Sequence, residues 1–165
     1  MNKKKIYLIF LIPLFIFSQA ENDEFENKIN NYKQKFKINC ATEKATNNKG
    51  NGQEILYGTR NFRSILHGIA YRGGGNNYYH RENKRENKNP LPQDGLENLL
   101  KVGFSNIVYL YKTNWETAPR SVTDGKKKLD YFQLSGNDFD SRDSILSMVY
   151  ETIKNNDLGP VYLHC

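Results

Sequence analysis

Apolar residues recur at helical spacing in three segments of the chain. The segment "PQDGLENLLKVGF" (92–104) places its leucines on one face, and "SRDSILSMVYETIKNN" (141–156) has apolar residues at the i, i+3, i+4 and i+8 positions. A more polar segment, "FENKINNYKQKFKI" (25–38), repeats the spacing. The pattern predicts two amphipathic helices in the second half and a further helix near the amino terminus, and Asp140 or Ser141 is expected to cap the helix at 141–156.

Short apolar runs between these helices predict strands. "NIVYLY" (106–111) is nearly continuous in apolar character, which is typical of a strand buried on both faces. "LDYFQLS" (129–135) and "VYL" (161–163) are similar, and "FRSILHGIAYRGG" (62–74) has roughly strand spacing. The order strand, helix, strand, strand, helix, strand predicts an α/β fold with a mainly parallel central sheet flanked by helices.

The composition along the chain suggests three regions. Residues 21–54 are rich in Asn, Lys and Glu, and predict a polar extension and linker. The compact domain is expected to span residues 55–165. Within it, the charged stretch 76–90 predicts a long loop that is a candidate rim for an anionic substrate through Arg81, Lys84, Arg85 and Lys88, or simply a solvated loop.

The first twenty residues have the features of a secretory signal peptide. Three consecutive lysines precede an apolar run from Ile6 to Phe17, and the small residues Ser18 and Ala20 stand where a signal peptidase would cut. The run is too short to span a bilayer of about 30 Å. We therefore expect a secreted or periplasmic protein with no membrane attachment after cleavage; an uncleaved anchor is the alternative.

Charge and residue spacing exclude some functions. The formal charge is +6, and removal of Lys3, Lys4 and Lys5 with the signal leaves +3, so the basicity is mild. No nucleic-acid-binding motif accompanies it, and no nucleic-acid partner is predicted. The three histidines and two cysteines lack the paired spacing of zinc ligands, so no metal is predicted.

The segment "GPVYLHC" (159–165) is the strongest candidate for chemistry. Its apolar strand delivers His164 and Cys165 at the carboxyl end, where open α/β sheets bind ligands. In an exported protein, a disulfide with Cys40 is one alternative, and a buried structural cysteine at a strand end is another.

Together with other segments, this strand resembles a known family. "GPVYLHC" follows an amphipathic helix and the loop "SGNDFDSRD", and "YRGG" and "GLENLLKVGFSNIVYLY" lie farther upstream. The combination resembles the first part of a cysteine-dependent phosphatase of the tyrosine or dual-specificity type, from about residue 62 to residue 165.

The resemblance implies specific roles. Cys165 would be the nucleophile, and His164 would orient the phosphate-binding loop. Asp138, or failing it Asp140, would be the general acid, and an Asx-turn or cap residue in a polar loop is the alternative role of Asp138. Arg72 would contact phosphate or tether the acid loop, and a structural salt bridge is its alternative role. The substrate would be a phosphorylated protein or a small phosphomonoester, without a cofactor.

The sequence departs from the family after the nucleophile. In the family, a loop of backbone amides and an arginine follow the cysteine, and none of these residues is present here. A thiol needs nearby amides or cations to become a thiolate, so we expect a domain incomplete at its carboxyl end and inactive alone. A phosphate-binding or partner-binding module without catalysis is the alternative function.

Overall fold

The computed structural model describes residues 22–75 and 89–165. The expected signal peptide and the charged positions Arg81, Lys84, Arg85 and Lys88 lie outside these ranges. The described part contains an amino-terminal helix over residues 22–36, where the apolar spacing predicts one.

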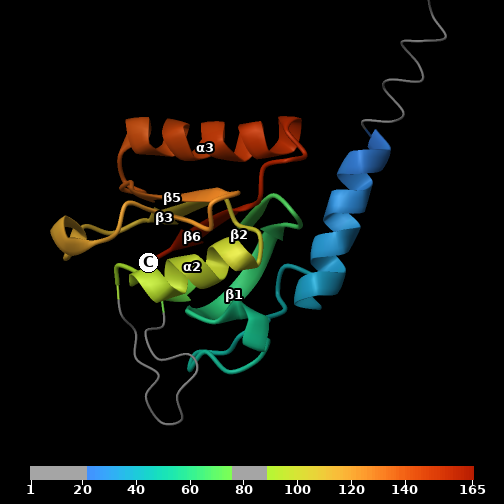
Figure 1. Cartoon of the computed structure of the whole chain (residues 1–165), viewed down its shortest axis with the longest axis horizontal. Coiled ribbons are helices and arrows are strands. Elements are labelled where there is room, and N and C mark those ends of the chain that lie inside the picture. The colour runs from blue at the N-terminus through green and yellow to red at the C-terminus, as the bar shows by residue number, and fades with distance from the viewer. Residues whose placement is uncertain (1–21, 76–88) are drawn as a thin grey trace, which may run out of the picture.

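The central element is a six-stranded sheet between helices. Its strands are β1 (Thr59–Leu66), β2 (Ala70–Gly75), β3 (Asn106–Tyr109), β4 (Ser121–Thr123), β5 (Lys128–Gln133) and β6 (Val161–His164). The helices that accompany it are α2 (Gln93–Lys101) and α3 (Phe139–Lys154), with the short 3₁₀ helices η2 (Glu54–Leu56) and η3 (Trp115–Thr117). Helices α2 and α3 lie on opposite faces of the sheet (Figure 1). The predicted α/β class is confirmed.

The sheet is mixed. Its order is β1-β2-β6-β3-β5-β4. The neighbours β2 and β6, β6 and β3, and β3 and β5 are parallel, whereas β1 and β4 pair antiparallel at the two edges. The last strand of the chain therefore lies in the middle of the sheet, between strands that come much earlier in the sequence.

Two of the strands differ from the sequence prediction. The segment 62–74, expected as one strand, lies within a hairpin of β1 and β2, because the chain reverses at Gly68, which has a positive φ of 72°. Glycine has no Cβ and adopts this backbone conformation without strain. Strand β4 lies in the polar stretch between two predicted strands, where the sequence pattern predicts no further strand; its single buried side chain, Val122, is too weak a periodic signal to predict one.

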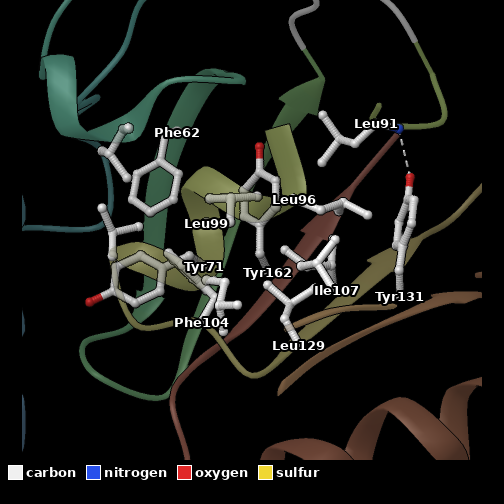
Figure 2. Packing of buried hydrophobic residues seen from close by; sticks show 14 of the residues in the cluster. Phe62, Tyr71, Leu91, Leu96, Leu99, Phe104, Ile107, Leu129, Tyr131 and Tyr162 are labelled. Carbon is white, nitrogen blue, oxygen red and sulfur yellow. Dashed lines mark hydrogen bonds between the residues drawn. The ribbon is translucent and has the colours of Figure 1, made fainter. Parts of the chain in front are cut away.

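The core lies between the sheet and α2 and is rich in aromatic rings. Figure 2 shows Phe62, Tyr71 and Tyr162 of the sheet packed with Leu96 and Leu99 of α2. The rings of Phe62 and Tyr71 are stacked with centroids 5.0 Å apart, and those of Phe62 and Tyr162 are 5.5 Å apart.

This core extends into the segment assigned from sequence to the polar extension. Phe36 and Ile38 are both fully buried. The ring of Phe36 lies 5.1 Å from that of Tyr71 and 5.2 Å from that of Phe62, both edge-on. The helix at 22–36 thus contributes side chains to the same core as the sheet.

The amino-terminal helix also contacts α3. The buried Lys28 ammonium donates hydrogen bonds to the carbonyl oxygens of Thr152, at 2.9 Å, and Leu158, at 2.8 Å. The Thr152 carbonyl lies in the last turn of α3, where the helix leaves acceptors unpaired and a cation is favourable, and the Leu158 carbonyl lies in the loop that follows. Burial lowers the pKa of Lys28, and nearby Asp157 opposes that shift.

Substitution of Phe36 tests whether the amino-terminal segment belongs to the core. Phe36→Ala should lower the free energy of unfolding by about 3–5 kcal/mol, because it removes a fully buried ring. Phe139→Ala is the matched control, since Phe139 is 77% exposed and its loss should cost less than about 0.5 kcal/mol. Urea unfolding measures both, and equal effects would contradict the assignment.

Candidate functional site

A groove lies at the carboxyl end of β6, where the sequence predicts the site. It has a volume of about 530 Å³ and contains the exposed Cys165. Its lining comes from β1, β2, the ends of β3 and β6, and the segment before β1: Lys44, Asn48, Arg60, Asn61, Arg63, Ile65, Arg72, Gly73, Gly74, Leu110, Leu163, His164 and Cys165. Four of these side chains are cationic, and no carboxylate lines the groove within the described ranges.

The alternation of side chains along β6 separates its last two residues. His164 is level with Gly73 of β2 and Tyr109 of β3. Its ring is almost fully buried and packs among aromatic rings on the α2 face, whereas Cys165 is exposed in the groove. Successive strand residues point to opposite faces, so the buried histidine places the cysteine on the open face.

His164 is held by two hydrogen bonds. Its Nε2 lies 2.8 Å from the Tyr131 hydroxyl, and its Nδ1 lies 3.1 Å from Asn89 Oδ1. Because an amide oxygen only accepts, Nδ1 carries the proton, and the Tyr131 hydroxyl donates to Nε2. That hydroxyl in turn accepts from the Leu91 amide at 2.9 Å (Figure 2).

The surroundings of His164 keep the ring neutral. Its ring stacks on those of Tyr109, at 5.2 Å, and Tyr162, at 5.9 Å. Burial lowers its pKa from 6.5 to about 3. A neutral, hydrogen-bonded ring fixes the end of β6 in position, and thereby fixes the position of Cys165.

The predicted general acid, Asp138, caps α3. Its carboxylate accepts a hydrogen bond from the Ser141 amide at 2.9 Å. The expectation that Asp140 or Ser141 is the cap is therefore wrong by two or three residues, because the helix begins at Phe139. Hydrogen bonding from Ser141 lowers the pKa of Asp138, with smaller contributions from Lys112 and Arg142. The carboxylate form of Asp138 is thus favoured.

Asp138 and Cys165 lie at the same end of the sheet, where its parallel strands have their carboxyl ends. The loop before α3 leaves the carboxyl end of β5, and β5 and β6 both run parallel to β3 between them. Asp140 lies in the first turn of α3, and its side chain is exposed.

Arg72 and Cys165 both line the groove. Arg72 is exposed and pairs in register with Leu163, one position before His164. Sequence reasoning missed the other cations of the groove, Lys44, Arg60 and Arg63. The spacing of the two arginines concealed them, because residues three apart in a regular strand point to opposite faces.

The two cysteines are not paired with each other. Cys40 and Cys165 are both free, so the disulfide alternative is wrong. The Cys40 sulfur lies 3.1 Å from the Thr42 hydroxyl, and hydrogen bonds from Thr42 lower the pKa of this thiol. Across the described ranges, no three His, Cys, Asp or Glu side chains gather closely enough to hold a metal ion.

Comparison with known proteins returns no matching family, no similar curated protein and no similar solved structure. Within residues 22–75 and 89–165, no helix is both long and apolar enough to cross a membrane.

The buried neutral His164 should make stability depend on pH. Unfolding exposes the ring and returns its pKa from about 3 to 6.5, so only the unfolded chain gains a proton between these values. Stability from this residue is complete above pH 6.5 and falls as the pH drops. Between pH 7 and pH 5 the loss should be about 2 kcal/mol.

Urea unfolding at the two pH values measures this loss in the wild type and in His164→Gln, whose pH dependence should be flatter. His67→Gln is the comparison: burial lowers the pKa of His67 as well, but its ring is only partly buried, so this variant should flatten the pH dependence less than His164→Gln. If both variants keep the wild-type pH dependence, the assignment of a buried neutral ring is incorrect.

Asp138 should contribute to stability as a helix cap. Asp138→Ala should lower the Tm by roughly 2–5 °C, because the Ser141 amide loses its acceptor, and Asp138→Ser should restore most of the loss. Asp140→Ala is the control two residues away, because Asp140 is exposed and is not the cap. Thermal unfolding followed by circular dichroism distinguishes them, and a larger effect at Asp140 would argue against the cap.

Proposed function

We propose that this chain carries the nucleophile and part of the substrate site of a cysteine-dependent phosphatase of the tyrosine or dual-specificity type, which hydrolyses phosphomonoesters. The observation that supports the proposal most strongly is the position of Cys165: an exposed thiol at the end of a central strand, in a groove lined by four cations. Cations attract a phosphate dianion and form strong hydrogen bonds with its oxygens.

The proposed reaction proceeds in two displacements. The Cys165 thiolate attacks phosphorus, the bond from phosphorus to the ester oxygen breaks, and a carboxyl group before α3 gives a proton to the departing oxygen. A water molecule then attacks the cysteinyl phosphate, the sulfur–phosphorus bond breaks, and inorganic phosphate leaves. The carboxylate accepts the proton of the water, which returns both groups to their starting states.

The cap on α3 affects which carboxyl group can act as the acid. A general acid must be protonated, and the hydrogen bond from Ser141 favours the ionised form of Asp138. Asp138 serves as the acid only when its capping hydrogen bond opens, whereas Asp140 is the second residue of α3 and does not serve as its cap. The two residues are therefore the acid candidates, with Asp138 first by family resemblance.

A second function is favoured by the same cap. If Asp138 stays ionised at the helix end, the groove can bind a phosphate group without catalysing its hydrolysis. The chain would then act as a phosphate-binding module on a phosphatase-like scaffold.

Alkylation of the two cysteines tests the position of the nucleophile. Iodoacetamide should modify both exposed thiols, and saturating inorganic phosphate should slow the reaction at Cys165 by at least roughly ten-fold, because phosphate occupies the groove. Cys40 is the internal control and should change by less than about two-fold. Peptide mass spectrometry gives the two rates, and equal protection would contradict the proposed site.

Turnover separates the enzyme from the binding module. With the complete product of the gene, hydrolysis of an aryl phosphate should fall by roughly a thousand-fold or more in Cys165→Ser and remain unchanged in Cys40→Ser. Protection of Cys165 by phosphate without turnover would favour the binding module. Equal turnover by the wild type and Cys165→Ser would reject the nucleophile.

A further inference from the structure

The arginines of the groove share one face because β1 is irregular. In the β1 and β2 pairing, Arg60 is opposite Gly74 and Arg63 is opposite Arg72, so three positions on β1 match two on β2. The extra residue forms a bulge, and Asn61 within it has a positive φ of 51°. Because of the bulge, the side chains of Arg60 and Arg63 lie on the same face of the sheet, and both line the groove.

Arg60 lies across Gly74 toward the strand of the nucleophile. A Cβ added at Gly74 would be 3.0 Å from Arg60 Nε and 3.1 Å from its Cγ, so the arginine occupies the space that a side chain would fill. Gly73 pairs with His164, and the same register continued by one residue places Gly74 beside Cys165. Arg60, Gly74 and Cys165 thus form a row across three strands, about 10 Å from end to end.

A second cationic row lies two residues away along the strands. Arg63, Arg72 and Leu163 are neighbours across the same three strands. Two like charges directly opposite each other on an antiparallel pair are unfavourable. No carboxylate in the described part of the chain pairs with either guanidinium, and a bound anion between them would remove the repulsion.

Buried donors in both rows point to the same conclusion. Arg60 Nε and Arg63 Nε are buried and have no hydrogen-bond partner in the described structure. A buried donor without a partner costs about 1–3 kcal/mol. Two such donors, one in each row and separated by about 7 Å along the strand, favour a ligand with more than one anionic group.

We propose that the groove is a two-anion site for a compact, polyphosphorylated small molecule: Arg60 holds the group nearest Cys165, and Arg63 with Arg72 holds the second. The identity of the reacting phosphate rests on the proposed function, whereas the binding of two anions does not. A peptide with a single phosphate would leave the second row unneutralised.

Isothermal titration of the chain with three probes tests the site at constant ionic strength. Pyrophosphate carries two linked phosphates, and inorganic phosphate and phenyl phosphate carry one each. Pyrophosphate should bind at least roughly ten-fold more tightly than either monophosphate, because it contacts both rows. Equal affinity of pyrophosphate and the monophosphates would overturn the proposal, and tighter binding of phenyl phosphate would favour a phosphorylated aryl or peptide ligand instead.

Variants assign the two rows. Arg63→Gln should weaken pyrophosphate binding by roughly ten-fold and change phosphate binding by less than about two-fold. Gly74→Ala keeps every charge but displaces Arg60, so it should weaken both ligands. Arg120→Gln is the matched control, because Arg120 lies over the Trp115 ring, outside the groove, and its loss should change neither affinity.

Further readouts keep the outcomes distinct. Circular dichroism establishes that each variant is folded, and Arg63→Lys, which keeps the charge but loses the fork of donors, should fall between Arg63→Gln and the wild type. If Arg120→Gln weakens pyrophosphate as much as Arg63→Gln does, binding is non-specific and the proposal fails. Cys165-dependent turnover with no preference for pyrophosphate would reject only the two-anion site. A pyrophosphate preference with an unreactive Cys165 would reject only the phosphatase.

Discussion

The arrangement of the protein depends on the pairing of β6 with β2 on one side and β3 on the other. The four residues of β6 join the hairpin of β1 and β2 to the unit formed by β3, β5 and β4. Both neighbours of β6 come much earlier in the chain, so the sheet forms only when segments distant in sequence meet. Such contacts are costly in chain entropy. Tyr162 and His164, both buried, anchor the strand in the core.

The same strand determines the two faces of the site. On the α2 face, the His164 ring is locked between aromatic rings and hydrogen-bonded to Tyr131 and Asn89. On the other face, Cys165 meets solvent and the arginines of the hairpin. A rigid buried residue beside an exposed thiol is the arrangement expected where a reactive group must be held in a defined position. This positioning underlies both the proposed chemistry and the proposed binding of two anions.

The groove also shows how a local irregularity creates a charged surface. With regular alternation, one of Arg60 and Arg63 would lie among the core side chains, at a large cost in desolvation. The bulge at Asn61 places both on the open face, and the absence of a side chain at Gly74 leaves room for Arg60. The cost of gathering like charges there is the physical reason to expect an anionic ligand.

The sequence by itself determined the α/β class, the two amphipathic helices, the amino-terminal helix and the position of Cys165 at the end of a buried strand, because apolar periodicity is a local property. Only the tertiary structure decided the mixed sheet, the burial of Phe36 in the common core and the cap at Asp138. It alone brought Arg60, Arg63 and Arg72 to one face, because strand register, bulges and the packing of distant segments depend on partners that a local pattern does not contain.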